Sequence, residues 1–238
     1  MCSKEDVDAR DIRASTTVFA GYAGALRWKG RANQIDQARS VTAEPKLPYV
    51  IVVAGPNGAG KSTSAHHLLR DTLEVSEFVN ADDIAAGLSA FRPETVAVSA
   101  GRIMLTRMRE LAAARVNFAF ETTLASRSLA PWLETLQRDG YQVHLLFLWL
   151  RSADLAVSRV AERVRAGGHD VPEAVVRRRY RAGLTNFFRL YCPLADSWRL
   201  LDNSASTGPR PIAAGQGDAV RILGDNEIWR KLKVSFDG

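Results

Sequence analysis

Residues 55–62, Gly-Pro-Asn-Gly-Ala-Gly-Lys-Ser, have the composition and spacing of a phosphate-binding loop. Glycines at three of these positions allow successive backbone N–H groups to point at one phosphate. Lys61 can reach the β- and γ-phosphates of a nucleoside triphosphate, and the Ser62 hydroxyl can ligate Mg²⁺. We therefore expect ATP or GTP to bind here with Mg²⁺. The expected nucleotide contacts are Gly55, Pro56, Asn57, Gly58, Ala59, Gly60, Lys61, Ser62 and Thr63.

Two adjacent acids, Asp82 and Asp83, follow Asn80 at the end of the second expected strand. A kinase needs a carboxylate that accepts the proton of the acceptor hydroxyl. We expect Asp82 to be this general base and Asn80 to lie beside the acceptor. By position Asp83 is the better cap for a helix that begins near Ile84, and exchange of the two roles is the alternative.

Glu121 ends the apolar run 117–121. An acid at the end of a strand beside a phosphate loop holds the hydration shell of Mg²⁺ or orients the substrate. The next apolar run is followed by Arg151 instead, so Glu121 is the expected carboxylate on the metal side. We expect it to contact the acceptor together with Thr122. The alternative is a structural acid bonded to Thr122 or Thr123.

An arginine-rich segment at about 152–190 has the layout of a helical lid. Arg159 and Arg163 are spaced to share one helix face, and a Gly-Gly pair at 167–168 then separates two helices. We expect Arg163 to neutralise charge on the moving phosphoryl group, and Arg159 and His169 to contact the acceptor. A solvated basic face is the alternative for such a run. The second helix carries Arg177, Arg178, Arg179 and Arg181.

Strands and helices alternate from Tyr49 onward, which predicts an α/β fold with a doubly wound, mostly parallel five-stranded sheet and helices on both faces. The expected strands are Tyr49–Ala54, Glu77–Asn80, Asn117–Glu121, Gln142–Leu150 and Trp198–Leu201. The expected helices are Ser64–Leu69, Glu94–Ala114, Ser128–Asp139, Ala153–Ala166, Pro172–Leu190 and Asn226–Lys233, with two short strand-like runs at Ile212–Ala214 and Val220–Leu223.

Three further features complete the expected kinase domain, which spans 47–238. Asp170 and Glu173 have the spacing of a capping box. Asn203 follows the last core strand, where the base of the donor nucleotide could lie. The aromatic residues of the segment between them suit a helix core better than base stacking. These aromatic residues are Phe187, Phe188, Tyr191 and Trp198.

Residues 1–46 precede the first expected strand and form an extension of unknown role, joined through Pro45 and Pro48. Its stretch Val18–Trp28 has enough apolar residues for a short helix.

The composition narrows the function classes. The chain has 238 residues, 46% of them hydrophobic, and a formal charge of +6 from 32 Lys and Arg against 26 Asp and Glu. Because the arginines gather in one segment, this charge favours polyanionic nucleotides over nucleic acid. The two cysteines are far apart without metal-ligand spacing, which favours a reducing, cytoplasmic location. A run of about 18 apolar residues is missing from the sequence, so no membrane span is expected.

The ordered set of motifs resembles the zeta toxin family of small-molecule kinases, and more closely its chromosomal "predicted ATPase" branch than the plasmid toxins. The resemblance covers roughly 47–215. The motifs that carry it are 55–63, 80–85, 121–124, 159–164 leading into 167–173, and 202–204 followed by 211–213.

The resemblance implies a P-loop kinase fold and transfer of the γ-phosphate of ATP or GTP to a sugar hydroxyl. The best-known members phosphorylate UDP-N-acetylglucosamine and are restrained by a partner antitoxin. By motif position, Lys61 is similar to the family's phosphate-binding lysine and Asp82 to its general base. Glu121 falls on the acid of the substrate and metal site, and Arg163 on the lid arginine. His169 stands where toxin members often carry a second arginine.

Two other functions remain open at this point. One is a kinase for a different acceptor, such as a nucleoside, an antibiotic or an RNA end. The other is a nucleotide-switched protein that hydrolyses ATP slowly. Asp82 argues against the switch, because a switch needs a positioned water rather than a base for an acceptor.

Overall fold

The computed structural model describes residues 47–65, 75–217 and 219–237. The extension 1–46, with its expected helix, lies outside the described residues, as does the later part of the helix expected over 64–69. The predictions for those segments stay predictions.

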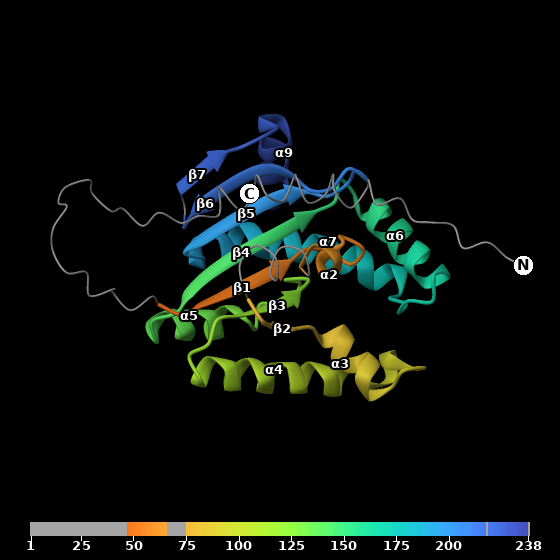
Figure 1. Ribbon diagram of the computed structural model, residues 1–238. Helices are drawn as coiled ribbons and strands as arrows, with labels where there is room; N and C mark the ends of the chain where they lie inside the picture. The colour runs from red at the N-terminus through yellow and green to blue at the C-terminus, as the bar shows by residue number, and fades with distance from the viewer. Residues whose placement is uncertain (1–46, 66–74, 218, 238) are drawn as a thin grey trace, which may run out of the picture.

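One seven-stranded sheet forms the centre of the molecule, in the order β2-β3-β1-β4-β5-β6-β7 (Figure 1). The first five strands run parallel, and the last two join antiparallel. The predicted α/β class with a mostly parallel sheet is confirmed. The strands are β1 Tyr49–Ala54, β2 Glu77–Val79, β3 Phe118–Thr122, β4 Gln142–Trp149, β5 Ser197–Asp202, β6 Arg210–Gln216 and β7 Ala219–Ile222.

The predicted count of five strands is two too low, because the strand-like runs of the tail belong to the same sheet. The connection from Asp202 to Arg210 is too short for the crossover that a parallel pair needs. The chain therefore turns back, and β6 pairs antiparallel with β5.

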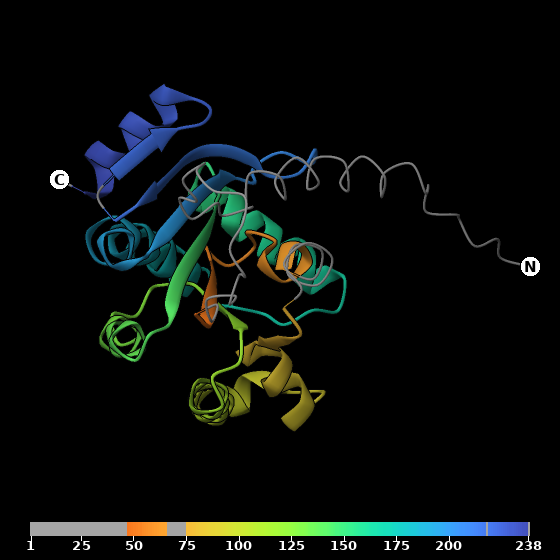
Figure 2. The same cartoon turned by 60° about the vertical axis from the view of Figure 1, so that its left-hand side comes forward.

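Both faces of the sheet are covered, as expected for a doubly wound fold. Alternate residues of β1 enter two separate cores. Val50 and Val52 belong to the large core with the residues of α4, α5 and α7, and Ile51 and Val53 belong to a smaller core with Ala65 of α2. Figure 2 shows α5 and α7 on one side of the sheet and α2 on the other. The continuous burial of β1 follows from this double covering.

The helices agree with the expected order but differ at several ends. They are α2 Lys61–Ala65, α3 Ala81–Leu88, α4 Ala97–Ala113, α5 Ala130–Arg138, α6 Ala153–Arg165, α7 Glu173–Asn186, α8 Cys192–Leu194 and α9 Asn226–Phe236. A 3₁₀ turn, η2 Pro93–Val96, precedes α4, and a π-helical turn, η3 Phe187–Tyr191, follows α7.

Two capping predictions are wrong. Helix α3 begins at Ala81, and its cap is Asn80, whose side chain accepts a hydrogen bond from the Asp82 N–H. Asp83 therefore lies in the first turn and is not the cap. Helix α7 begins after Pro172 and has no side-chain cap. The Asp170 capping box is not formed, because α7 begins at Glu173 and Asp170 lies before the cap position. The Glu173 carboxylate accepts from Arg177 Nε at 2.8 Å.

The aromatic residues that follow α7 form a core cluster, which confirms the prediction for Phe187, Phe188, Tyr191 and Trp198. The rings of Phe147 and Phe187 lie 4.7 Å apart, and Trp198 stacks on Trp229 of α9 at 5.6 Å. Helix α9 and the end of α7 are thereby fixed to the sheet.

The carboxyl ends of the parallel strands meet at one edge of the sheet, beside α2 and α6 (Figure 1). Ligands of open α/β sheets bind at this edge. Within the described residues, none of the helices combines the length and the apolar character that a membrane crossing requires.

Candidate active site

The loop between β1 and α2 has a backbone shape that only glycine supports at three positions. Gly55, Gly58 and Gly60 have φ angles of +143°, +77° and +73°. A Cβ at Gly55 would lie 2.3 Å from the carbonyl oxygen of Leu148, and one at Gly60 would lie 2.9 Å from Asn203 Nδ2. The loop is therefore closely packed as well as sharply turned, which suits a cradle of backbone N–H groups.

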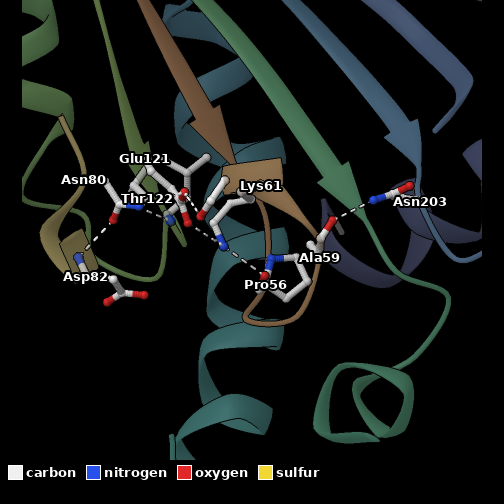
Figure 3. Close-up of polar contacts among 10 residues, drawn as sticks. Pro56, Ala59, Lys61, Asn80, Asp82, Glu121, Thr122 and Asn203 are labelled. Atoms are coloured by element: carbon white, nitrogen blue, oxygen red, sulfur yellow. Dashed lines mark hydrogen bonds and ion pairs between the residues drawn. The ribbon is translucent and has the colours of Figure 1, made fainter. Parts of the chain in front are cut away.

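Lys61 lies inside this loop with 6% of its surface exposed. Its ammonium donates to the Pro56 carbonyl at 3.0 Å and lies 3.5 Å from Glu121 Oε1 (Figure 3). Burial lowers the pKa of Lys61, while the Glu121 and Asp82 carboxylates oppose that shift. Lys61 thus connects the phosphate loop with Glu121 near the end of β3.

Glu121 at the end of β3 is bonded to two other polar residues. Ser62 donates its hydroxyl to Glu121 Oε2 at 2.7 Å, and Asn80 Nδ2 donates to the same oxygen at 3.3 Å. The alternative bonds do not form among the described residues: the Glu121 carboxylate contacts Ser62, Asn80 and Lys61, and not Thr122 or Thr123.

The Ser62–Glu121 pair fits Mg²⁺. Mg²⁺ prefers oxygen ligands, keeps several waters, and is commonly held by one or two protein oxygens together with substrate phosphates. A hydroxyl and a carboxylate 2.7 Å apart at the end of the phosphate loop supply such oxygens. Among the described residues there is no group of three or more His, Cys, Asp or Glu side chains that would form a protein-only metal site.

Asp82 lies in the first turn of α3, with its backbone N–H bonded to Asn80 Oδ1 at 2.9 Å. Its side chain is exposed, and its carboxylate makes no hydrogen bond or ion pair with another described residue. In Figure 3 this carboxylate points away from Asn80. Its charge acts on the pKa values of both Lys61 and Arg179, so the carboxylate lies near both cations.

Arg159 of α6 lies on the donor side of the site. Its guanidinium donates to the carbonyl oxygens of Asn203 at 2.7 Å and Ser204 at 3.0 Å. A Cβ at Gly58 would lie 3.1 Å from the Arg159 Cβ, so this arginine also contacts the phosphate loop. Arg159 therefore joins α6 to the loop after β5, and its expected contact with the acceptor stays a prediction.

Asn203 is also bonded to the phosphate loop. Its Nδ2 donates to the Ala59 carbonyl at 2.8 Å, and its backbone N–H donates to Trp149 at 2.9 Å. The interaction with Ala59, drawn in Figure 3, supports the loop shape directly. The expected contact of Asn203 with a donor base stays a prediction.

Arg163 lies one turn after Arg159 on α6. Its terminal amino group donates to the His169 carbonyl at 2.7 Å, while its Nε is buried with no partner among the described residues. Its charge is one of the influences that lower the pKa of Lys61, so the two cations are near each other. His169 is half-buried, and it contributes its backbone carbonyl to this arrangement. Its ring makes no hydrogen bond or ion pair with another described residue.

One arginine of α7 takes a position that the sequence did not single out. Arg179 is half-buried and lies near Asp82, whereas Arg178 and Arg181 are exposed. The sequence feature that could have identified Arg179 is its position four residues before Gly183. Residues four apart share a helix face, and a glycine often marks a place where another segment approaches the backbone closely.

Comparison with known proteins identifies a matching family and one relative in sequence. The model of the AAA domain family matches residues 50–185. An uncharacterized protein of Haemophilus influenzae is 28% identical over 130 residues, which cover 55% of this chain and 91% of that protein.

Solved structures with the same architecture include a crystal structure of AvrRxo1-ORF1:-ORF2 with ATP. The TM-score is 0.61 at 16% identity, and the match covers 94% of this chain and 69% of that chain. Another belongs to the PezAT chromosomal toxin–antitoxin system of Streptococcus pneumoniae. Its TM-score is 0.55 at 12% identity, covering 99% of this chain and 91% of that chain. At these identities the likeness shows the fold.

Proposed function

The chain belongs to the AAA domain family, and from this premise we propose that it is a Mg²⁺-dependent kinase for a hydroxyl of a small molecule, with a nucleotide sugar such as UDP-N-acetylglucosamine as the acceptor. The observation that carries the proposal is the position of Asp82. Asp82 has an exposed carboxylate that makes no hydrogen bond or ion pair with another described residue, and its charge acts on the buried phosphate-loop lysine, Lys61. A phosphoryl acceptor needs a base in that position.

The donor nucleotide binds to the phosphate loop. Backbone N–H groups of 55–62 surround the β-phosphate, and the N-terminus of α2 adds partial positive charge. Lys61 exchanges its contact with the Pro56 carbonyl for phosphate oxygens. Because Lys61 is already buried beside Glu121, it needs little rearrangement to do so. ATP is the proposed donor, in keeping with the ATP of the AvrRxo1-ORF1:-ORF2 structure.

Ser62 and Glu121 would hold Mg²⁺, which supplies charge neutralisation for the β- and γ-phosphates when bound. Asn80 keeps the Glu121 carboxylate in place from the other side through its Nδ2 group. The same Asn80 caps α3 and so fixes the start of the helix that carries Asp82. One side chain thus sets the spacing between the acid on the metal side and the base.

Asp82 accepts the proton of the acceptor hydroxyl as its oxygen attacks the γ-phosphorus. The bond from γ-phosphorus to the bridging oxygen of the donor breaks, and ADP leaves. Arg163 neutralises charge on the transferring phosphoryl group, because its guanidinium is close enough to Lys61 to act on the pKa of that residue and its buried Nε has no partner among the described residues. His169 holds the other end of that guanidinium through its carbonyl.

A toxin-like role with an antitoxin partner is part of the proposal. The support is the likeness over nearly the whole chain to a protein of the PezAT toxin–antitoxin system, and to a structure that holds two components, AvrRxo1-ORF1 and -ORF2. The zeta toxin resemblance of the motifs points the same way, and a cytoplasmic location follows from such a substrate.

The test measures ADP release from ATP with and without acceptors, followed by mass spectrometry for products heavier by one phosphate. We expect release that depends on UDP-N-acetylglucosamine and a phosphorylated nucleotide sugar. Asp82→Asn is the inactive comparison, and Asp83→Asn is its matched control in the same helix turn. Steady ADP release that no acceptor changes would replace the kinase with a slow ATPase.

A further inference from the structure

Helix α7 carries four arginines whose surroundings differ. Arg177 is paired with Asp154 at 2.6 Å and with Glu173 at 2.8 Å. Arg178 and Arg181 are exposed. Arg179 is half-buried, and within the described part of the chain it makes no hydrogen bond or ion pair. It is therefore the arginine of this helix whose charge is partly removed from water without a bonded partner.

The position of Arg179 follows from the way α7 is docked. A Cβ at Gly183 would lie 2.4 Å from the Thr123 carbonyl oxygen, so the helix touches the segment after β3 at this point. Asn186 Nδ2 donates to the Leu124 carbonyl at 2.7 Å. Arg179 lies four residues before Gly183 and shares its face. It is thus one helical turn from the end of β3, on the side of the site that holds Thr122.

Charge and burial agree with this placement. Burial lowers the pKa of Arg179, and the Asp82 carboxylate opposes that shift. Arg179 and Asp82 come from different elements, α7 and α3, and they face the same space without being bonded to each other. The five N–H donors of Arg179 remain available to a ligand that enters beside Asp82.

We propose that Arg179 binds an anionic group of the acceptor, a phosphate or a carboxylate, next to the hydroxyl that Asp82 deprotonates. The inference rests on the proposed kinase function and names the residue that selects the acceptor. The planar guanidinium fork suits two oxygens of one phosphate or carboxylate. Arg163 and Lys61 are on the donor side, so Arg179 gives the acceptor side a cation of its own.

The first experiment compares the full-length wild type with R179A, R179K and the adjacent exposed control R178A. Each is assayed on pairs of acceptors that differ in charge: UDP-N-acetylglucosamine and N-acetylglucosamine, uridine 5′-monophosphate and uridine, gluconate and glucose. The first two pairs test a phosphate and the third tests a carboxylate. Circular dichroism and thermal unfolding check that each variant is folded.

We expect R179A to raise the KM for the anionic acceptor roughly 10- to 100-fold, with a smaller change in kcat and no change in the KM for ATP. R179K keeps the charge without the fork and recovers part of the loss. R178A behaves as the wild type. The uncharged member of each pair loses nothing in R179A, so the preference for the anionic member falls.

Three results would overturn the assignment: an equal loss with charged and uncharged acceptors, an equal loss in R178A, or a fall in kcat with a shifted pH profile and an unchanged acceptor KM. The last pattern would mean that Arg179 acts only through Asp82.

A second measurement separates this inference from the kinase proposal. Binding of inorganic pyrophosphate is followed by calorimetry while a non-hydrolysable ATP analogue and Mg²⁺ saturate the phosphate loop. We expect binding by the wild type and R178A, and binding weaker by about 10-fold or more in R179A. If no acceptor yields ADP but pyrophosphate binding still depends on Arg179, the kinase proposal fails and the anion site remains. If R179A equals the wild type in both measurements, the anion site is wrong.

Discussion

The phosphate loop and helix α7 each carry a cation on which the charge of Asp82 acts, but the two cations are held differently. Lys61 of the loop is buried and contacts Pro56 and Glu121 before any ligand arrives. Arg179 of the helix is half-buried and has no bonded partner among the described residues. Lys61 is thus bonded within the protein, whereas the guanidinium of Arg179 keeps its donors for the ligand that we propose.

This difference separates two kinds of substitution. Changes in the loop should remove activity with every acceptor, because the donor is common to all of them. Changes on α7 should alter which acceptor is used while leaving the donor site intact.

Lys61→Ala should abolish ATP turnover while the protein stays folded. The Lys61 ammonium is expected to bind the phosphates of ATP, so turnover is lost without it. The fold is kept, because the Glu121 carboxylate is still bonded to Ser62 and Asn80. ADP release and thermal unfolding measure the two effects. Wild-type turnover in a folded Lys61→Ala protein would contradict the donor-site assignment.

Asp82→Asn should retain ATP binding and lose phosphoryl transfer by about 10²–10⁴-fold, since a positioned base typically contributes that factor. Asp83→Asn, in the same exposed turn, should remain active. Single-turnover transfer and nucleotide titration separate the two effects. An inactive Asp83→Asn beside an active Asp82→Asn would exchange the two roles.

Arg163→Ala should slow transfer by about 10²-fold with little change in ATP affinity, because the guanidinium acts on charge that develops in the transition state. Arg163→Lys should restore part of the rate, since the charge is kept and the fork is lost. The value of kcat and the dissociation constant for ATP are measured for each of the three proteins. Equal rates would make Arg163 a helix-surface residue.

Gly183→Ala should destabilise the fold by about 1–3 kcal/mol and raise the acceptor KM while the ATP KM stays constant. The added methyl would meet the Thr123 carbonyl at 2.4 Å, so α7 must shift, and Arg179 shifts with it. Gly101→Ala is the matched control, because a Cβ there has nothing within 4 Å. Chemical denaturation and steady-state kinetics report the two effects. A matching change in the ATP KM would show that donor and acceptor sides are not separable.

A chain that starts at Lys46 should fold and bind ATP as the full chain does, which is the smallest expected effect. All seven strands lie after that residue. Thermal unfolding and nucleotide titration decide the matter. An unfolded truncation would mean that residues 1–46 belong to the domain, and that their apolar residues cover part of its surface.

The donor side could be predicted from sequence because its signals are local. The phosphate loop lies within eight consecutive positions, 55–62, and its glycine conformations follow from residue type. Glu121 was found in the same way, as the acid that ends an apolar strand. Its bond to Ser62 could not be read from either segment alone, although both lie at carboxyl ends of neighbouring strands.

The acceptor side resisted prediction because it depends on how distant segments meet. Apart from its spacing from Gly183, nothing in the sequence distinguishes Arg179 from the other arginines of α7, because the docking of the helix sets which of them lies near Asp82. Arg159 shares a helix face with Arg163, yet its donors are taken by backbone carbonyls after β5. The Asp170 cap was wrong because α7 begins only at Glu173, and residue spacing alone does not fix where a helix begins.

The seam between α7 and the strand ends is built on main-chain oxygens. Tyr180 donates to the Leu150 carbonyl, Asn186 donates to the Leu124 carbonyl, and Gly183 lies against that of Thr123. Every residue type supplies such an oxygen, so the side chains of the facing segments can change over generations without undocking the helix. In evolutionary terms, the facing side chains are therefore free to vary while the docking of α7 is inherited.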